Sequence, residues 1–158
     1  MATSGSKNVT VTAWNTLKFS WWENSQSIAN NTTTIGWKME LIAESSGRID
    51  SSTSKTWSVT VNGTKYSGTN TVGIGNNATK TLASGTTTIT HNANGTKTFS
   101  YAFSQSFSGI TFSGTSLGTK SGSGSGTLDT IPRASNLTAS NGTLGTAQTL
   151  TITEKASS

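Results

Sequence analysis

The sequence predicts an all-β protein, an antiparallel β-sandwich of the jelly-roll or immunoglobulin-like kind. Apolar and polar residues alternate with a period of two in several stretches, which is the pattern of strands that bury one face. Turn signals containing Gly and Asn separate these stretches at intervals of about 8 to 12 residues. No stretch shows the three- and four-residue apolar spacing of an amphipathic helix.

The two clearest alternating runs are residues 57–61 and 99–103, each with three large apolar residues that would share one face. The first run precedes Asn62-Gly63, and the second follows Asn94-Gly95. Asn-Gly steps tolerate the positive φ values of tight hairpin turns. We therefore expect both runs to be strands of one antiparallel layer, each beside a hairpin turn.

In the N-terminal half, three strands are expected after a polar lead-in at the start of the chain. They cover residues 9–13, 17–22 and 35–42. A turn near Trp14 separates the first two, and a polar loop over residues 24–34 separates the second from the third. The strand over 35–42 is the clearest of the three, because four large apolar residues alternate along it.

In the C-terminal half the apolar residues are sparser. Residues 72–74 predict one short strand, and Leu82 and Ile89 predict two more, on either side of a Ser-Gly step. Glycines within the segment 107–117 indicate bulges or bends. Residues 118–126 are nearly all Gly, Ser and Thr, so we expect a terminal strand that grades into a flexible linker.

The pattern assigns residues 8–131 to one sandwich domain. Ile131-Pro132-Arg133 is the predicted boundary, because it holds the single proline of the chain and the composition changes after it. Residues 132–158 are then a linker and a C-terminal extension that resembles the start of a second β module. So few residues cannot bury a core of their own. The extension therefore docks on the domain, contacts another subunit, or begins a truncated second module.

Composition narrows the classes of partner. The formal net charge is +5, but the eleven Lys and Arg residues are spread along the chain rather than clustered, so we expect no nucleic-acid binding. There are no cysteines, no signal-peptide pattern and no apolar run of membrane-spanning length. We expect synthesis in a cytoplasm and no membrane insertion.

The sequence offers no catalytic constellation, so we expect a protein that is not an enzyme and needs no metal or cofactor. Its six Asp and Glu residues form no evident acid pair. His91 is the single histidine and stands before a turn, without a nucleophile motif. We interpret His91, Asn94 and Gly95 as residues that anchor this turn.

Aromatic residues are the candidate ligand-binding groups. Indole and phenol rings stack on the apolar faces of sugar rings while neighbouring polar groups hold the hydroxyls. Trp22, Tyr66 and Trp14 do not fit the inward register and are the candidates for such a platform. The other three tryptophans, Trp21, Trp37 and Trp57, fit that register and are expected in the core.

Four segments carry a resemblance to a known family. They read WWENSQSIANNTTT at 21–34, TWSVTVNGTKYSG at 56–68, TLASGTTTITHNANGTKTFSYAFSQSF at 81–107 and SGSGTLDTIPRAS at 123–135. Over about residues 9–135 the chain resembles the siphophage minor structural proteins, tail-associated proteins of phages that infect Gram-positive bacteria. Members of this family often have Asp where this chain has Asn94, which argues against an acidic or cation-binding role for the turn.

The resemblance implies a virion component of the tail tip or a tail fibre that faces the host cell wall. Such a protein is assembled in the bacterial cytoplasm and released by lysis, and it contacts other virion proteins and further copies of itself. Two functions remain open. One is a module that binds cell-wall polysaccharide or teichoic acid, and the other is a fibre spacer or capsid decoration protein without receptor binding.

Overall fold

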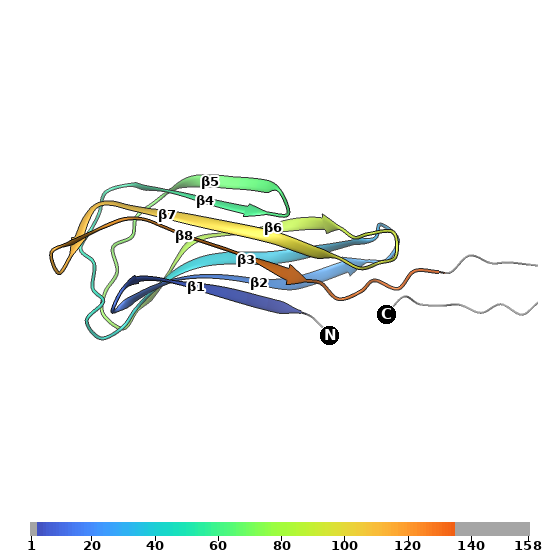
Figure 1. The fold of residues 1–158 in the computed structure, drawn as a ribbon, viewed down its shortest axis with the longest axis horizontal. Coiled ribbons are helices and arrows are strands. Elements are labelled where there is room, and N and C mark those ends of the chain that lie inside the picture. Colours follow the sequence, from blue (N-terminus) through green and yellow to red (C-terminus); the bar gives the residue numbers. More distant parts are fainter. Residues whose placement is uncertain (1–2, 135–158) are drawn as a thin grey trace, which may run out of the picture.

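The computed structural model describes residues 3–134 and contains eight strands and no helix in that range (Figure 1). The strands are β1 (Ser4–Thr12), β2 (Asn15–Ser27), β3 (Thr32–Ala43), β4 (Lys55–Val61), β5 (Thr64–Asn70), β6 (Thr79–Thr90), β7 (Thr98–Phe112) and β8 (Thr115–Thr127). They form two four-stranded antiparallel sheets, ordered β1-β2-β3-β6 and β5-β4-β7-β8. The predicted antiparallel β-sandwich is therefore confirmed. The C-terminal extension lies outside the described residues, apart from its first three.

The strand order corresponds to the immunoglobulin-like alternative. In such sandwiches strands A, B and E share one sheet, and strands C, F and G share the other with C′ at its edge. Here β2, β3 and β6 take the places of A, B and E, while β5, β4, β7 and β8 take those of C′, C, F and G. The additional strand β1 extends the first sheet.

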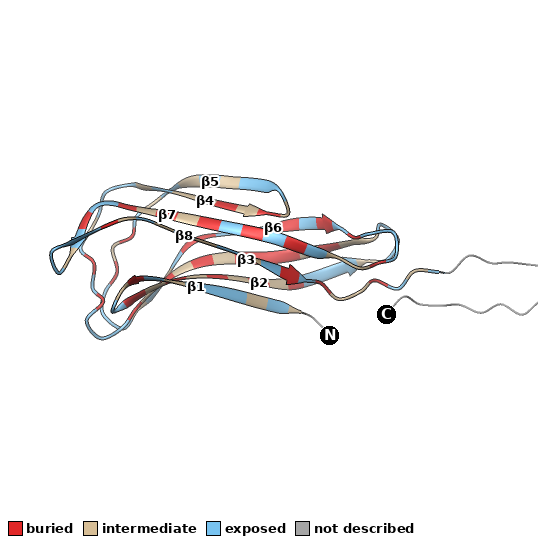
Figure 2. Cartoon of the chain, viewed as in Figure 1, coloured by how far each residue is buried: buried red, intermediate tan, exposed pale blue. Residues whose placement is uncertain are grey.

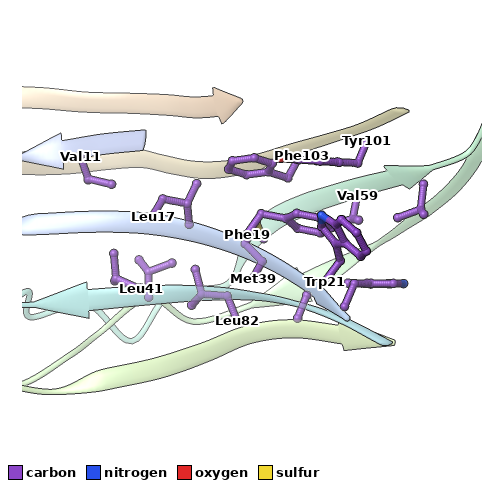
Figure 3. Packing of buried hydrophobic residues seen from close by; sticks show 14 of the residues in the cluster. Val11, Leu17, Phe19, Trp21, Met39, Leu41, Val59, Leu82, Tyr101 and Phe103 are labelled. Atoms are coloured by element: carbon purple, nitrogen blue, oxygen red, sulfur yellow. The ribbon is translucent and has the colours of Figure 1, made fainter. Parts of the chain in front are cut away.

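The core lies between the sheets and follows the predicted alternation. The runs 57–61 and 99–103 are neighbours in the second sheet, where Val59 stands opposite Phe103. Figure 2 shows buried and exposed residues alternating along β7. In Figure 3, Phe19 of the first sheet meets Tyr101 and Phe103 of the second, with ring centroids 4.7 and 5.4 Å apart. The predicted core residues Trp21 and Trp37 are buried, and Trp57 is half-buried with its ring 6.4 Å from that of Trp37.

Glycines complete the packing because they stand beside aromatic rings on neighbouring strands. Four of the five tryptophans have a glycine directly opposite, in the pairs Gly5–Trp21, Gly36–Trp22, Gly68–Trp57 and Gly85–Trp37. The inward glycines of β8 stand opposite the inward aromatics of β7, in the pairs Gly118–Phe107, Gly122–Phe103, Gly124–Tyr101 and Gly126–Phe99. At all of these positions except Gly118, where a Cβ atom would meet nothing within 4 Å, the rings occupy the space that a side chain would need.

This packing corrects the linker prediction for residues 118–126. The segment belongs to the strand β8, in which Gly122, Gly124 and Gly126 face the core and the serines face solvent. At the other end of the chain, β1 begins at Ser4, so most of the expected lead-in is a strand. Both segments look like loops because the positions of inward parity carry glycine or lysine instead of large apolar residues.

Three further expectations were wrong in detail. Leu82 and Ile89 lie in one strand, β6, with a register shift near Leu82 rather than a break. Residues 72–74 form no strand, and Ile74 makes an isolated bridge to Ile49. The predicted loop over 24–34 shrinks to a turn, because β2 and β3 extend into it from both sides.

The two Asn-Gly steps differ in role. Asn62 and Gly63 have φ values of 48° and 82°, so they form the two-residue hairpin turn expected between β4 and β5. Asn94-Gly95 instead lies in the connection from β6 to β7. This connection crosses from the first sheet to the second. The hairpin expectation was therefore wrong for the second step, since a connection between sheets cannot be a hairpin.

Candidate functional site

The two ends of the sandwich carry different kinds of feature (Figure 1). We call the end with the start of β1, the end of β8, the turn 28–31 and the loop 91–97 the proximal end. The opposite, distal end carries the turn 13–14, the loops 44–54 and 71–78, and the turn 113–114. The chain enters and leaves the described domain at the proximal end, because the additional strand β1 starts where β8 finishes.

At the proximal end the segment 128–133 is bound to the loop 91–97 by backbone hydrogen bonds. Leu128 N–H donates to the Lys97 carbonyl at 2.9 Å, and Ile131 N–H donates to the Gly95 carbonyl at 3.0 Å. Ile131 is fully buried, and the Arg133 guanidinium donates to the Ile28 carbonyl at 2.9 Å. We call this arrangement the exit clamp. It holds the chain at a defined place and direction as it leaves the domain.

The residues predicted to anchor the turn lie inside this clamp. The buried His91 places Nδ1 2.7 Å from the Gly95 carbonyl and Nε2 2.6 Å from Thr33 Oγ1. A carbonyl only accepts, so Nδ1 carries a proton and donates to Gly95, while Nε2 shares the second hydrogen bond with the Thr33 hydroxyl. Asn94 Oδ1 accepts from Thr96 N–H at 3.0 Å, and Gly95 has a φ of 86°. A Cβ atom at Gly95 would collide with the Ile131 carbonyl.

A carboxyl pair, Glu23 and Asp129, also lies at the clamp and was missed by the sequence interpretation. Glu23 is 9% exposed, and its Oε1 accepts from Asp129 N–H at 2.7 Å. Asp129 Oδ1 accepts from Thr3 Oγ1 at 2.6 Å, and the Asp129 carbonyl accepts from Gln26 Nε2 at 2.9 Å. Burial first, and then the neighbouring Asp129 carboxylate, raise the pKa of Glu23 above 4.5.

The missed pair had one readable signal. Glu23 follows Leu17, Phe19 and Trp21 in the inward parity, which marks it as a carboxylate on a buried face. Its partner Asp129 is 106 residues away in the sequence, so no spacing rule connects the two. The backbone N–H of Asp129 holds the Glu23 carboxyl group, and the Thr3 hydroxyl holds that of Asp129, so both groups have structural roles at the exit clamp.

Trp22 lies on the outer face of the first sheet. Its indole covers the buried Gly36 of β3, and its Nε1–H donates to Asn24 Oδ1 at 2.9 Å. The ring is half-buried, and an ion pair of 3.2 Å between Lys38 and the partly buried Glu40 lies further along β3. Trp22 is therefore an outward-facing aromatic on a polar sheet surface, as the sequence predicts.

Tyr66 is placed differently from the prediction. It stands opposite Val59 in the inward register of β5, with its ring 5.2 Å from Trp37. Its hydroxyl lies 3.0 Å from Thr87 Oγ1 on β6. The expectation that Tyr66 departs from the inward register was wrong, because β5 is an edge strand whose inward side chains reach across to the other sheet. Tyr66 joins the two sheets and is not an exposed platform.

Trp14 is the tryptophan with the greatest exposure, 40%, in the described chain. It occupies the β1–β2 turn at the distal end, where its N–H donates to Thr12 Oγ1 at 3.0 Å and its carbonyl accepts from Glu44 N–H at 2.9 Å. Trp14 lines a groove of about 270 Å³ together with Phe112, Leu117 and the β7–β8 turn.

A second, wider hollow of about 650 Å³ lies between the loops 44–54 and 71–78. Its surface includes Gly73 and Gly75 from one loop and the ion pair of Arg48 with Asp50, 2.9 Å apart, from the other. Both hollows open at the distal end. The distal end therefore combines an exposed aromatic, two depressions and loops from both sheets.

Comparison with known proteins identifies the family. A family model described as siphovirus protein of unknown function (DUF859) matches residues 16–158. The chain belongs to this siphovirus family. No match is found among curated proteins or among solved structures. The resemblance that the sequence motifs indicate is thereby confirmed at the level of the family.

In this siphovirus protein the two most specific motifs of the resemblance, HNANGTKTFSY at 91–101 and the described part of TIPRAS at 130–134, meet in space. They are the two sides of the exit clamp, joined by the hydrogen bond from Ile131 to Gly95. Within residues 3–134 no helix has the length and apolarity needed to cross a membrane. Nor do three or more His, Cys, Asp or Glu residues of that range gather as a metal would require.

Proposed function

We propose that this protein is a non-enzymatic structural module of a siphovirus virion, located in the tail tip or a tail fibre, that contacts the host cell wall through its distal end. Membership of the siphovirus family supports a phage role. The observation that carries the proposal is the polarity of the domain, with the chain entering and leaving at the proximal end and Trp14 exposed at the other.

The strand β1 creates this polarity. In the immunoglobulin-like order the first strand of the β2-β3-β6 sheet would begin at the distal end, beside the loop 44–54. Adding β1 in front of β2 returns the entry of the chain to the proximal end. Within the described residues, the chain then neither enters nor leaves the domain beside the distal loops. Loops on a rigid sandwich are common places for recognition.

The net charge of +5 supports contact with an anionic wall. Dispersed positive charges attract an anionic polymer such as teichoic acid over distances of about one Debye length, roughly 8 Å at physiological salt. Such attraction would steer encounter, while specific contacts would come from the distal end. We expect assembly in the bacterial cytoplasm with other virion proteins and with further copies of this chain, followed by release at lysis.

A second candidate is a fibre spacer or capsid decoration protein without a receptor. The exit clamp favours it, because a spacer needs a fixed direction between successive modules and the clamp holds residues 128–133 against the domain. In that case Trp14 and Trp22 would contact neighbouring virion proteins rather than the host.

The test is binding of the fluorescently labelled full chain to intact host cells and to purified cell walls. Saturable binding that weakens with added salt supports the proposal. Walls stripped of teichoic acid and polysaccharide should bind less than untreated walls. Absence of binding to both cells and walls would contradict the proposed cell-wall contact. The fibre spacer or capsid decoration protein would then be the remaining candidate. Release of soluble peptidoglycan fragments from the walls would contradict the non-enzymatic assignment.

A further inference from the structure

The groove at the distal end is formed by two turns from different sheets. One side is the β1–β2 turn with Trp14, and the other is the β7–β8 hairpin with Phe112. The walls are apolar and the rim carries hydroxyl groups, from the residues Val11, Trp14, Phe112, Leu117, Thr12 and Thr115. None of the lining residues is ionisable.

Both sides of the groove are held by the fold. Trp14 is fixed through hydrogen bonds of its N–H and its carbonyl, and the next residue, Asn15, is buried and donates to the Gly47 carbonyl at 2.7 Å. On the other side, Ser113 and Gly114 have φ values of 48° and 79° and form a tight two-residue turn. A rigid groove loses little conformational entropy when it binds a ligand.

The chemistry of the lining restricts the occupant. An aromatic wall favours a ligand with a flat or slightly curved apolar face, and the hydroxyl rim favours a ligand with hydroxyl groups at its edge. The lack of ionisable groups favours an uncharged ligand, since a buried charge would need a partner. The volume of about 270 Å³ is slightly below the range of pockets that hold drug-sized ligands, roughly 300–1,000 Å³, which fits a single ring.

The indole N–H of Trp14 adds a donor. Trp22 Nε1–H donates to Asn24, and Trp37 Nε1–H donates to Thr87. Within the described residues no protein group accepts from Trp14 Nε1–H, and the ring is exposed. This N–H is therefore available to a hydroxyl or carbonyl oxygen of a ligand.

We propose that the groove between Trp14 and Phe112 binds one uncharged pyranose ring of a host cell-wall polysaccharide, with the ring stacked on the Trp14 indole. This inference rests on the proposed contact with the cell wall and names the chemistry of that contact. It also assigns different roles to the tryptophans, because Trp14 binds sugar whereas Trp22 on the sheet face does not.

The direct test follows the five indole N–H signals in a two-dimensional ¹H–¹⁵N spectrum of the full chain. The Trp14→Phe variant identifies the Trp14 signal. The probes are glucose, galactose, rhamnose, N-acetylglucosamine and oligosaccharides released from host cell walls. We expect a saturable shift of the Trp14 signal with at least one probe, while the Trp37 signal stays in place. No shift with any probe, or a shift of Trp22 alone, would overturn the inference.

Cell binding supplies the second test. Trp14→Ala should weaken binding to host cells at least tenfold, while Trp22→Ala changes it less than twofold. Thr115→Phe, at an exposed rim position, fills the groove without removing a wall and should weaken binding as Trp14→Ala does. Circular dichroism and thermal melting check that each variant is folded.

The outcomes separate the two proposals. If the unaltered chain binds cells and Trp14→Ala binds equally well, the groove inference fails while the cell-wall function stands. If the unaltered chain does not bind cells or walls, the proposed function itself fails. If the groove instead joins two copies of the chain, sedimentation will show a dimer that Trp14→Ala dissociates, and the sugar assignment is wrong.

Discussion

Trp37 on β3 stands directly opposite Gly85 on β6, and a Cβ atom at Gly85 would lie 2.6 Å from the indole ring. The same relationship joins Trp22 to Gly36, where the closest distance would be 2.5 Å. Each indole ring packs over the backbone of the opposite glycine, in the space that a side chain at that position would otherwise occupy. The stability of this thin core therefore depends on glycines as much as on the aromatic residues.

The first prediction concerns Gly85. Trp37 is 1% exposed and cannot move aside, so Gly85→Ala should lower the free energy of unfolding by about 1–3 kcal/mol, the usual cost of overpacking. Urea denaturation measures the change. Gly75→Ala is the matched control, because a Cβ there meets nothing within 4 Å.

Gly36→Ala refines the same test. Trp22 is half-exposed and can swing outward, so the loss should be smaller than at Gly85 despite the equally close contact. Equal losses at the two glycines would contradict this explanation.

The second prediction distinguishes a strand from a linker in the Gly-Ser segment of β8. A Cβ at Gly122 would lie 2.6 Å from the Phe103 ring and 2.7 Å from Val9 of β1. Gly122→Ala should therefore destabilise the domain by about 1–3 kcal/mol. Ser123→Ala, at the exposed neighbouring position, should stay within about 0.5 kcal/mol of the original. A flexible linker would show no difference between the two substitutions in thermal or urea unfolding.

The third prediction concerns pH. The folded-state pKa of Glu23 is raised above 4.5 by burial and by Asp129, so the folded protein binds the proton more tightly than the unfolded chain. The resulting contribution to stability is fully present below pH 4.5 and is lost as pH rises through the folded pKa.

Glu23→Gln removes this titration while keeping an oxygen that accepts from Asp129 N–H. We expect the variant to gain stability relative to the original as pH rises from 4 to 7, measured by urea unfolding at each pH. Glu44→Gln, with an exposed side chain, is the control for the loss of one carboxylate. If the difference in free energy of unfolding between Glu23→Gln and the original chain stays constant with pH, the raised pKa of Glu23 is contradicted.

The fourth prediction concerns His91 and the exit clamp. His91→Ala removes the bonds to the Gly95 carbonyl and to Thr33, and each buried group left unpaired costs about 1–3 kcal/mol. The clamp should open more often, so trypsin should cut after Arg133 faster than in the original chain. Asn92→Ala, at an exposed position of the same loop, should leave the cleavage rate unchanged. Equal cleavage rates in the original chain and both variants would show that His91 does not hold the exit clamp closed.

The fifth prediction concerns Tyr66, whose hydroxyl bonds to Thr87 across the open side of the sandwich. Tyr66→Phe should reduce the free energy of unfolding by about 0.5–1.5 kcal/mol, the net value of a typical hydrogen bond. Binding to host cells should not change, because the ring lies against Trp37 and not on the surface used for contact. Loss of cell binding in a folded Tyr66→Phe protein would restore Tyr66 as a binding residue.

The relationship between Trp37 and Gly85 also shows where sequence interpretation succeeds and where it stops. The strand around Trp37 is readable, because burial of alternate side chains is a property of residues two apart in one chain. The turn at Asn62-Gly63 is readable for a similar reason, since positive φ is a local requirement. The family motifs are local as well, and they identified the family without any knowledge of the fold.

Long-range neighbours decide the rest. Gly122 is a core residue only because Phe103 stands beside it, and the same glycine in an isolated chain would be part of a linker. Glu23 and Asp129 become a pair, and Trp14 and Phe112 become the sides of a groove, because distant turns and strands meet at one end of the sandwich. Local alternation sets which face of each strand is buried. Strand pairing sets which residues surround each exposed side chain and each glycine.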